Sequence, residues 1–499
     1  MQRTVVSLDA IAGRGGPVRI ASPGGEAGGA KACASACGGA PRPAKDMPAD
    51  IQAKIAEHPC YSEEAHHFFA RMHVAVAPAC NIQCHYCNRK YDCANESRPG
   101  VVSRRLNPDQ AVAKVLAVAA EMPQLSVVGI AGPGDALANP TATFETFERI
   151  TAALPDIKLC LSTNGLALPD HVETIRKLDI SHVTVTLNAV DPEVAAQIYP
   201  WVSFDRKRWT GRAAAEILLA RQREGIVALV AAGVLVKINS VLIPGINDDH
   251  LVEVNAEVQR WGVFLHNIMP LISDPAHGTH FGLTGRRGPK PSELKGLQDR
   301  LGGGAALMKH CRQCRADAVG LLGEDRNAEF AEDRAEAEPP VVDPVKRQAY
   351  RRLVARERAD RRAAAAEAAA HLIAAASDDS LLVAVCTRGS GRVNQHFGHA
   401  GEFQIYEVDR SGVRLIGHRR AGHYCQGGDG DDVVLEHTIA ALDGVRVVLA
   451  AKIGRCPRDR LAEAGITVFE DFAGQYIEPA AAAAFRAFTR IDATIARSA

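Results

Sequence analysis

The alternation of strand-like and helical segments is the feature that most restricts the fold of this chain. Six candidate strands span residues 73–79, 125–132, 157–165, 182–190, 234–245 and 264–272. Helical stretches lie between them, including 107–122, 141–154 and 171–178. Short strands joined by helices of this length form βαβ units with a parallel sheet. The pattern favours a partial (β/α) barrel, whose chemistry lies at the carboxyl ends of its strands, and an open doubly wound sheet is the alternative.

Changes in composition divide the 499 residues into four regions. Residues 1–50 are rich in Gly, Ala and Pro, so we expect a disordered tail. Residues 51–323 contain the strand–helix alternation. Residues 324–379 begin as a charged, Pro-rich linker and continue as Arg- and Ala-rich sequence that predicts a solvated helix. Residues 380–499 contain enough strand-like and helical runs for a small second α/β domain.

The charge balance and the hydropathy pattern exclude some classes of partner. Lys+Arg and Asp+Glu both number 58, so no net charge favours nucleic acid or an anionic membrane. No run approaches the roughly 18 apolar residues of a membrane span, and no secretory signal pattern is present. We therefore expect a cytoplasmic protein. In that reducing compartment, thirteen cysteines indicate metal ligands or catalytic thiols rather than disulfides, although Cys33 and Cys37 in the tail are expected to be incidental.

The densest cysteine motif follows the first candidate strand. Cys80, Cys84 and Cys87 have the spacing CxxxCxxC on one short loop. Three thiolates there can hold three irons of a [4Fe–4S] cubane and leave the fourth iron open to S-adenosylmethionine (SAM). One electron passed into the sulfonium then releases a 5′-deoxyadenosyl radical. A structural zinc or a four-cysteine cluster is the alternative. The spacing, with Tyr86 before the last cysteine, resembles the signature of the radical SAM superfamily.

Two further features resemble parts of that superfamily that contact SAM. The segment GPGD at 132–135 resembles its Gly-Gly-Glu-type segment, which implies that Gly134 and Asp135 meet the SAM amino group. Asp replaces the usual Glu, which makes that contact less secure. Thr186 and Ile238 fall on the strands where the superfamily contacts the ribose and the adenine. A barrel-lining role is the alternative for both side chains.

Other candidate metal ligands lie outside the motif. A lone cysteine on a strand is usually a small core residue. Four residues before or at early strand ends could instead converge on a second iron–sulfur centre: Cys60, His73, Cys93 and Cys160. Cys311 and Cys314 form a CxxC pair after the last strand. Two thiolates are too few for a cubane without other ligands, so an auxiliary cluster is weighed against a redox dithiol.

Longer segments resemble one family. Residues 58–103, 132–140, 161–165 and 310–325 together resemble the NifB family of nitrogenase cofactor biosynthesis enzymes. Residues 385–408 resemble the NifX/NafY-type domain, an RNase H-like module that handles nitrogenase cofactor precursors. The resemblance implies an α/β fold with a partial (β/α) barrel of the radical SAM type and a small C-terminal RNase H-like α/β domain.

The resemblance also implies a reaction on metal clusters. NifB-like enzymes fuse two [4Fe–4S] clusters into an 8Fe–9S–C precursor, with SAM as methyl donor and radical source. Carried onto this chain, the SAM-cleaving cluster is held by Cys80, Cys84 and Cys87, one substrate cluster by Cys60, His73, Cys93 and Cys160, and the other in part by Cys311 and Cys314. Iron–sulfur cluster donor proteins and downstream nitrogenase cofactor carrier and scaffold proteins are the implied partners.

Two rival functions remain to be weighed. One is a different radical SAM enzyme with auxiliary clusters, such as a peptide-modifying or sulfur-inserting enzyme. The other is a carrier that only binds metalloclusters, although a carrier has no need for a motif that cleaves SAM. In the second domain, transient docking of a cofactor is weighed against ordinary polar contacts for His396, His399, Cys425 and Cys456.

Overall fold

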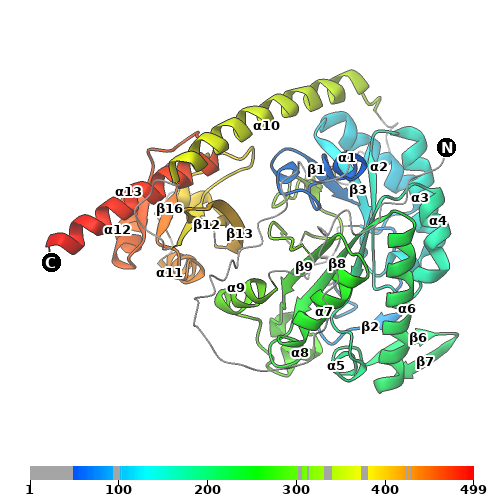
Figure 1. Ribbon diagram of the computed structural model, residues 1–499. Coiled ribbons are helices and arrows are strands. Elements are labelled where there is room, and N and C mark those ends of the chain that lie inside the picture. The colour runs from blue at the N-terminus through cyan, green and yellow to red at the C-terminus, as the bar shows by residue number, and fades with distance from the viewer. Residues whose placement is uncertain are drawn as a thin grey trace, which may run out of the picture.

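The computed structural model describes most of the chain beyond the expected tail. The described residues are 49–93, 102, 104–301, 306–311, 314–330, 340–372, 380–422, 425–426, 429–430 and 432–498. Cys33 and Cys37 lie outside them. Among the helices within these ranges, none combines the length and the apolar character needed to cross a membrane. Figure 1 shows two α/β parts with the long helix α10, Pro344–Leu372, running between them.

A seven-stranded sheet, in the order β10-β1-β3-β4-β5-β8-β9, forms the first part. The strands are Ala70–His73 (β1), Leu125–Ile130 (β3), Lys158–Thr163 (β4), His182–Thr186 (β5), Leu235–Leu242 (β8), Leu265–Pro270 (β9) and Val319–Gly320 (β10). All neighbours are parallel except β10, which pairs antiparallel with β1. A doubly wound sheet reverses its strand order, whereas the parallel strands here follow chain order throughout. The fold is the expected partial barrel.

Helices connect the parallel strands and cover one face of the sheet. Their bounds are Pro108–Glu121 (α2), Pro140–Ala153 (α3), Val172–Lys177 (α4), Gly211–Ala231 (α6), His250–Arg260 (α7) and Pro291–Arg300 (α9). The helix α2 begins at a capping box, in which Asn107 and Gln110 each accept a hydrogen bond from the other's backbone N–H, at 2.9 and 3.1 Å. Apolar side chains of the sheet and these helices form one continuous core.

The opposite face of the sheet is concave and polar. Register-matched residues of parallel neighbours point to the same side. His73 pairs with Gly129, Gly129 with Cys160, and Cys160 with His182. Leu161, one residue after Cys160, belongs to the core beneath the helices. The row that begins at His73 therefore lies on the concave face, where the candidate ligands are expected.

The first strand is shorter and earlier than the sequence predicts. We expect a strand at 73–79, whereas β1 ends at His73. The rest of that run continues beside β3 with scattered backbone hydrogen bonds, such as Val74 N–H to the Gly129 carbonyl at 3.0 Å. Its apolar side chains are buried, so the run serves packing without forming a regular ladder. This irregular segment leads directly into the cysteine loop.

A mixed five-stranded sheet, in the order β13-β12-β11-β16-β17, forms the second part. The strands are Leu381–Val385 (β11), Glu402–Asp409 (β12), Gly412–Arg420 (β13), Val447–Leu449 (β16) and Thr467–Phe469 (β17). Its helices are Asp432–Ala441 (α11), Arg455–Glu463 (α12) and Ile477–Ser498 (α13). Smaller elements complete the structure: Ala49–Ile55 (α1), Ile82–Gln83 (β2), Pro192–Ala196 (α5), Trp201–Phe204 (β6), Lys207–Thr210 (β7), His280–Leu283 (α8), Cys425–Gln426 (β14) and Asp429–Gly430 (β15).

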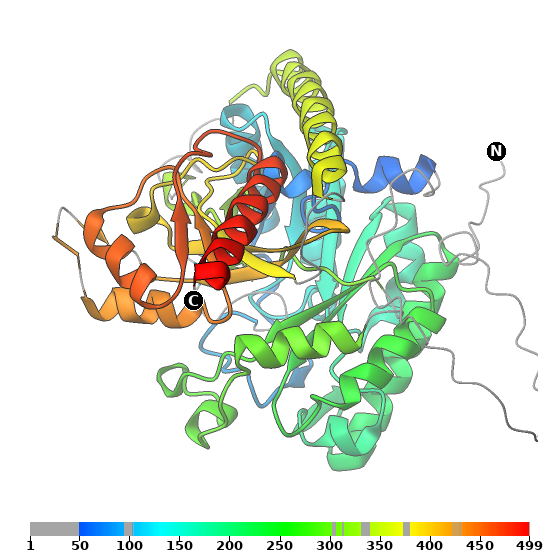
Figure 2. The ribbon, with the colours of Figure 1, turned by 60° about the vertical axis from the view of Figure 1, so that its left-hand side comes forward.

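The helix α10 differs from the expected solvated helix. It extends from the barrel to the second domain, where it packs beside α13 (Figures 1 and 2). Arg347 and Arg361 are buried, and they form ion pairs with Asp156 of the barrel part and Glu478 of α13. A face of arginines matched by carboxylates takes the place of an apolar stripe. One side of α10 is therefore an interface with both parts.

Candidate functional site

The loop that carries Cys80, Cys84 and Cys87 follows β1 and is folded back on itself. The short strand β2 lies inside the loop and pairs with β6. The Cys87 N–H donates to the Cys84 carbonyl at 3.1 Å. The side-chain amide of Gln83 donates to the carbonyls of Cys84 and Cys87, at 3.0 and 2.8 Å. These bonds hold Cys84 and Cys87 on one compact turn.

The chemistry of this loop suits an iron–sulfur cluster. Burial raises the pKa of Cys80 to about 11, and the carboxylate of Asp135 adds to the rise. Such a thiol loses its proton when a metal binds it. Among the residues that the structure describes, no three Cys, His, Asp or Glu side chains converge as ligands of a single metal ion. Three thiolates on one loop can bind three separate irons of a cubane, so the donor set of this loop fits an iron–sulfur cluster.

The segment GPGD lies directly against the start of the cysteine loop. The N–H groups of Gly134 and Asp135 donate to the carbonyls of Ala77 and Ala79, both at 2.7 Å. A Cβ on Gly134 would lie 2.1 Å from the Ala79 oxygen, a distance that no side chain can adopt. The glycine is therefore required for the close approach of these two loops.

The carboxylate of Asp135 is occupied by the protein itself. It accepts hydrogen bonds from the N–H groups of Leu137, Ala138 and Asn164, at 2.9, 3.2 and 2.5 Å, and from the Thr163 hydroxyl at 3.0 Å. A carboxylate offers about four acceptor positions, so little capacity is left for a ligand. The structure gives Asp135 a role in joining the ends of β3 and β4, a role that the resemblance alone does not show.

Asn164 is a site residue that sequence reasoning missed. The side-chain amide of Asn164 donates to the side-chain oxygen Oδ1 of Asn81 at 2.7 Å and to the Cys80 sulfur at 3.7 Å. Hydrogen bonds to a coordinating sulfur tune an iron–sulfur cluster. Asn164 belongs to residues 161–165, one of the segments that resemble the NifB family. Its position at the carboxyl end of a parallel strand was the signal that could have identified it.

The two residues expected to contact the nucleoside of SAM lie on opposite faces of the sheet. Thr186 pairs with Asn239, on the concave side. Ile238 points the other way, into the core with Ile226 of α6, and is fully buried there. The Ile238 side chain therefore lies in the core and not on the concave face, while the expected contact of this position with SAM stays a prediction. Val241, which shares the concave face with Asn239, packs in the same apolar cluster as Cys84 and Tyr86.

A second group of thiols lies on the concave face. Burial raises the pKa of Cys60, the nearby thiols of Cys314 and Cys160 raise it further, and the cations of Lys237 and Arg71 oppose the rise. The Arg71 guanidinium also donates to the Cys314 sulfur at 3.2 Å. Three thiols beside two cations suit an anionic iron–sulfur cluster, because the cations offset the charge of the thiolates.

His73 faces the same side as Cys160, two strands away. Gly129 lies between them, and a Cβ on Gly129 would lie 3.0 Å from the His73 ring. The Nδ1 atom of His73 contacts the Arg315 carbonyl at 3.1 Å, which leaves Nε2 as the ring nitrogen available to a metal. Burial, followed by Arg71, lowers the pKa of His73 to about 4. The imidazole is therefore neutral near pH 7, as a metal ligand must be.

Of the remaining candidate ligands, Cys311 and Cys93 lie closer to the cysteine loop. Cys311 packs against the apolar cluster that contains Cys84, whereas Cys314 lies beside Cys60. The CxxC pair thus faces both groups of thiols. Cys93 lies near Tyr86, whose pKa it helps to raise. The structure places Cys60 near Cys160 on the concave face, with His73 on the same face two strands from Cys160, and places Cys93 on the side of the motif.

Among the candidate ligands in the second domain, the two histidines lie close to each other. The rings of His396 and His399 lie 4.9 Å apart, and Nδ1 of His396 accepts from the Gly398 N–H at 3.0 Å. Cys456 is exposed at the start of α12. Cys425 belongs to β14, and its side chain lies outside the described part of the structure.

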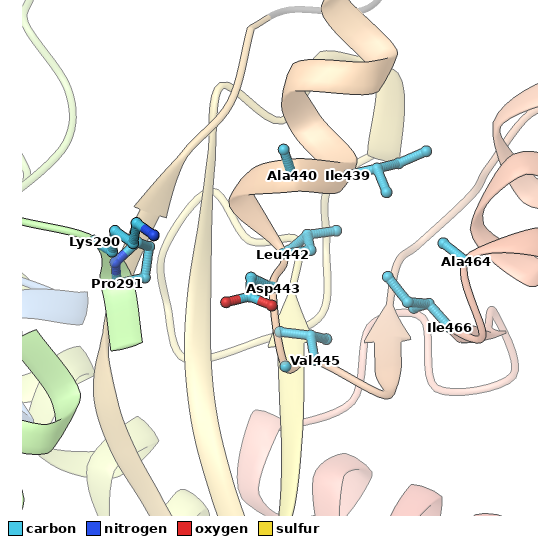
Figure 3. A pocket seen from close by; sticks show the side chains of 10 residues that line it. Lys290, Pro291, Ile439, Ala440, Leu442, Asp443, Val445, Ala464 and Ile466 are labelled. Carbon is cyan, nitrogen blue, oxygen red and sulfur yellow. The ribbon is translucent and has the colours of Figure 1, made fainter. Parts of the chain in front are cut away.

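A separate pocket lies where the second domain meets the start of α9 (Figure 3). Its volume is about 470 Å³, and its lining includes Lys290, Leu442, Asp443 and Ile466. None of its lining residues is a cysteine or a histidine. This pocket belongs to the boundary between the two parts and not to the thiol chemistry.

Comparisons with known proteins agree with this geometry. A family model described as "Radical SAM superfamily" matches residues 74–257, and one described as "Dinitrogenase iron-molybdenum cofactor" matches residues 379–487. The FeMo cofactor biosynthesis protein NifB of Rhodobacter capsulatus is 64% identical over 436 residues, which cover 87% of this chain and 96% of that protein. The protein of the same name in Sinorhizobium fredii is 59% identical over 90% of this chain and 91% of its own length. That of Azotobacter vinelandii is 52% identical over 91% of this chain and 92% of its own length. The chain therefore belongs to the NifB family of radical SAM enzymes.

Proposed function

We propose that this chain fuses two [4Fe–4S] substrate clusters, with insertion of a carbide, into an 8Fe–9S–C precursor of the nitrogenase iron–molybdenum cofactor. In this reaction SAM is both the methyl donor and the source of the radical, and the enzyme is a lyase-type cofactor maturase. The observation that carries the proposal is the second group of thiols, Cys60, Cys160 and Cys314, on the concave face. Thiols beside cations suit an anionic metal cluster better than an organic substrate.

The loop of Cys80, Cys84 and Cys87 would hold the SAM-cleaving cluster. When bound there, a [4Fe–4S] cluster supplies the electron that cleaves SAM to methionine and the 5′-deoxyadenosyl radical. The chain positions this loop through the contact of Gly134 with Ala79. The apolar cluster that includes Val241 excludes water beside it, which protects a radical from side reactions.

The concave face would hold the substrate clusters. Cys60, Cys160 and His73 are the ligands for one cluster, with Cys93 as a further candidate, and Cys311 and Cys314 are ligands for the other. A neutral imidazole is easier to exchange than a thiolate, so His73 suits a cluster that must be released when it is fused. Arg71 and Lys237 would offset the negative charge of the bound cluster.

The proposal includes protein partners. Two substrate clusters must be delivered, and the product must leave, so iron–sulfur donor proteins act before this enzyme and nitrogenase cofactor carrier and scaffold proteins act after it. The paired rings of His396 and His399 are the candidate docking point of the second domain.

One experiment separates the proposal from its rivals. The full chain is reconstituted anaerobically with iron and sulfide and then treated with SAM and dithionite. We expect S-adenosylhomocysteine, 5′-deoxyadenosine and a product that activates cofactor-free nitrogenase. Formation of the two nucleosides without the third product would favour a different radical SAM enzyme. If none of the three products forms, the result would favour a carrier that only binds metalloclusters.

A further inference from the structure

The segment that carries Cys60 lies under α10 and is fastened to it at both ends. The guanidinium of Arg358 donates to the Ala56 carbonyl at 2.8 Å, and the Tyr350 hydroxyl donates to the Phe68 carbonyl at 2.5 Å. Between these points, Val354 packs into a small apolar cluster with Phe68 and its neighbours. Residues 56–68, named here the Cys60 segment, are therefore attached to α10 at both ends.

Ion pairs reinforce this attachment on the acidic side chains of the Cys60 segment. Arg351 donates twice to Glu57, at 2.9 and 3.0 Å. Glu64 accepts from both Arg358 and Arg362, at 2.7 and 2.8 Å. The side chain of Glu64 is only 26% exposed, so these pairs are screened less than pairs on an open surface.

The second domain contacts the end of the same segment. The Ser390 N–H donates to the His67 carbonyl at 3.0 Å. Arg361 bridges His67, at 2.9 Å, and the carboxylate of Glu478 on α13. The Cys60 segment is therefore shared between the barrel, α10 and the second domain.

The inner side of the segment is anchored in the barrel. The Tyr61 hydroxyl donates to the carbonyls of Val183 and Leu235, at 3.2 and 3.3 Å. Nε2 of His310, the neighbour of Cys311, contacts the Pro59 carbonyl at 3.0 Å. Cys60 lies between these inner contacts and the arginines of α10, so both sets of contacts fix the position of its thiol.

We propose that α10 and the second domain position the Cys60 thiol for its cluster, with Glu64, Arg358 and Arg362 as positioning residues. A metal ligand on a segment outside the sheet must be held by its surroundings to keep a productive geometry. The second domain then contributes to the substrate site of the barrel as well as forming a domain of its own. This inference rests on the proposed function in one respect, which is that Cys60 is a cluster ligand.

The test uses full-length variants in which the charge of one carboxylate is reversed. Glu64→Arg places a cation beside Arg358 and Arg362, and the triple variant Glu64→Arg, Arg358→Glu, Arg362→Glu restores both pairs with opposite signs. Glu173→Arg is the matched control, because Glu173 also lies between two cations, Arg176 and Lys177, on the remote helix α4.

Two measurements are made on each variant. In the cluster-free chain, alkylation of each cysteine by iodoacetamide is followed by peptide mass spectrometry. We expect Cys60 to react about tenfold faster in Glu64→Arg, because the segment opens locally, while the buried Cys84 keeps its rate. After reconstitution, we expect the same variant to hold fewer irons while it still converts SAM to 5′-deoxyadenosine. The control should behave as the native chain does, and the triple variant should lie between Glu64→Arg and the native chain, because Arg358→Glu also removes the bond to the Ala56 carbonyl.

Each outcome has one meaning. An unchanged Cys60 rate in Glu64→Arg overturns the positioning role. Equal acceleration at Cys60 and Cys84 also overturns it, because that result indicates general unfolding. Faster alkylation of Cys60 with unchanged iron supports the positioning of the segment and contradicts the proposed function of Cys60 as a ligand.

Discussion

At the scale of single residues, the site depends on contacts that leave no room for a side chain. Gly134 touches the backbone of the cysteine loop, where a Cβ would lie 2.1 Å from the Ala79 oxygen and 2.7 Å from the Pro78 oxygen. Backbone atoms cannot move aside as the end of a flexible side chain can. A larger residue must displace the loop that begins with Cys80.

Gly134→Ala should therefore lower SAM cleavage by about 100-fold, the usual cost of a displacement near 1 Å in a reacting group. The measurement is 5′-deoxyadenosine formed per reconstituted protein with dithionite. Gly296→Ala is the matched control, since a Cβ at that helical glycine meets no atom within 4 Å. Native cleavage by Gly134→Ala would show that the two loops do not need this contact.

The pH dependence of stability offers a second prediction at this scale. Burial raises the pKa of Glu63 to about 7 from its usual 4.5, Arg361 opposes the rise and Glu478 adds to it. The folded chain keeps a proton that the unfolded chain releases, so this group favours folding at low pH and loses that contribution as pH rises from 4.5 to 7. Glu63→Gln should weaken this decline, as measured by urea denaturation at pH 5 and pH 7.5. If the free energy of unfolding falls equally with pH in the native chain and the variant, the raised pKa of Glu63 is contradicted.

The residues of the site differ in how far the sequence could identify them. Cys80, Cys84 and Cys87 have a spacing that is itself the ligand geometry, so the motif was found directly. The bond from Asn164 to the Cys80 sulfur crosses 84 positions and depends on the packing of two loops, which no local pattern encodes. The same holds for Asp135, whose five hydrogen-bonding contacts come from two different strand ends.

At the scale of elements, strand register decided which side chains could face SAM. The alternation of β8 puts Asn239 and Val241 on the concave face and Ile238 in the core. A strand was predicted at this position, but a one-residue difference in register exchanges the two faces. Because β8 is buried along its whole length, hydropathy alone could not tell them apart.

Ile238→Ala should consequently destabilise the barrel without acting on the chemistry. A truncated core isoleucine costs about 2–5 kcal/mol of unfolding free energy, and Ile238→Val about 0.5–1.5 kcal/mol. Denaturation curves give these values, while 5′-deoxyadenosine formed per folded protein should equal that of the native chain. A selective loss of SAM cleavage in Ile238→Val would return Ile238 to the cofactor site.

The helix α10 shows a different limit of sequence reading. Its length and position were predicted because Ala and Arg favour helices. Its interface with the two domains was not predicted, because a weak apolar stripe indicates a solvated helix. The buried face is built from Arg347, Arg351, Arg358 and Arg361, which are spaced on one side of the helix and meet carboxylates from distant segments.

At the scale of the whole molecule, one half-barrel carries two groups of thiols with different surroundings. The motif of Cys80 lies among apolar side chains that include Tyr86 and Val241. The group of Cys60 lies beside Arg71 and Lys237. The proposed function assigns two tasks to this division, cleavage of SAM in the apolar setting and retention of anionic clusters in the cationic one.

The most direct measurement of that division uses the full chain with Cys60→Ser, Cys160→Ser and Cys314→Ser together. After anaerobic reconstitution, iron content, 5′-deoxyadenosine formation and activation of cofactor-free nitrogenase are compared with the native chain. If the two groups are separate sites, the variant loses ligands of both proposed substrate clusters and binds about eight fewer irons, the content of two cubanes. It then still cleaves SAM and yields no activating product. Loss of SAM cleavage together with the iron, or full activation without these thiols, would contradict the division of the barrel into two sites.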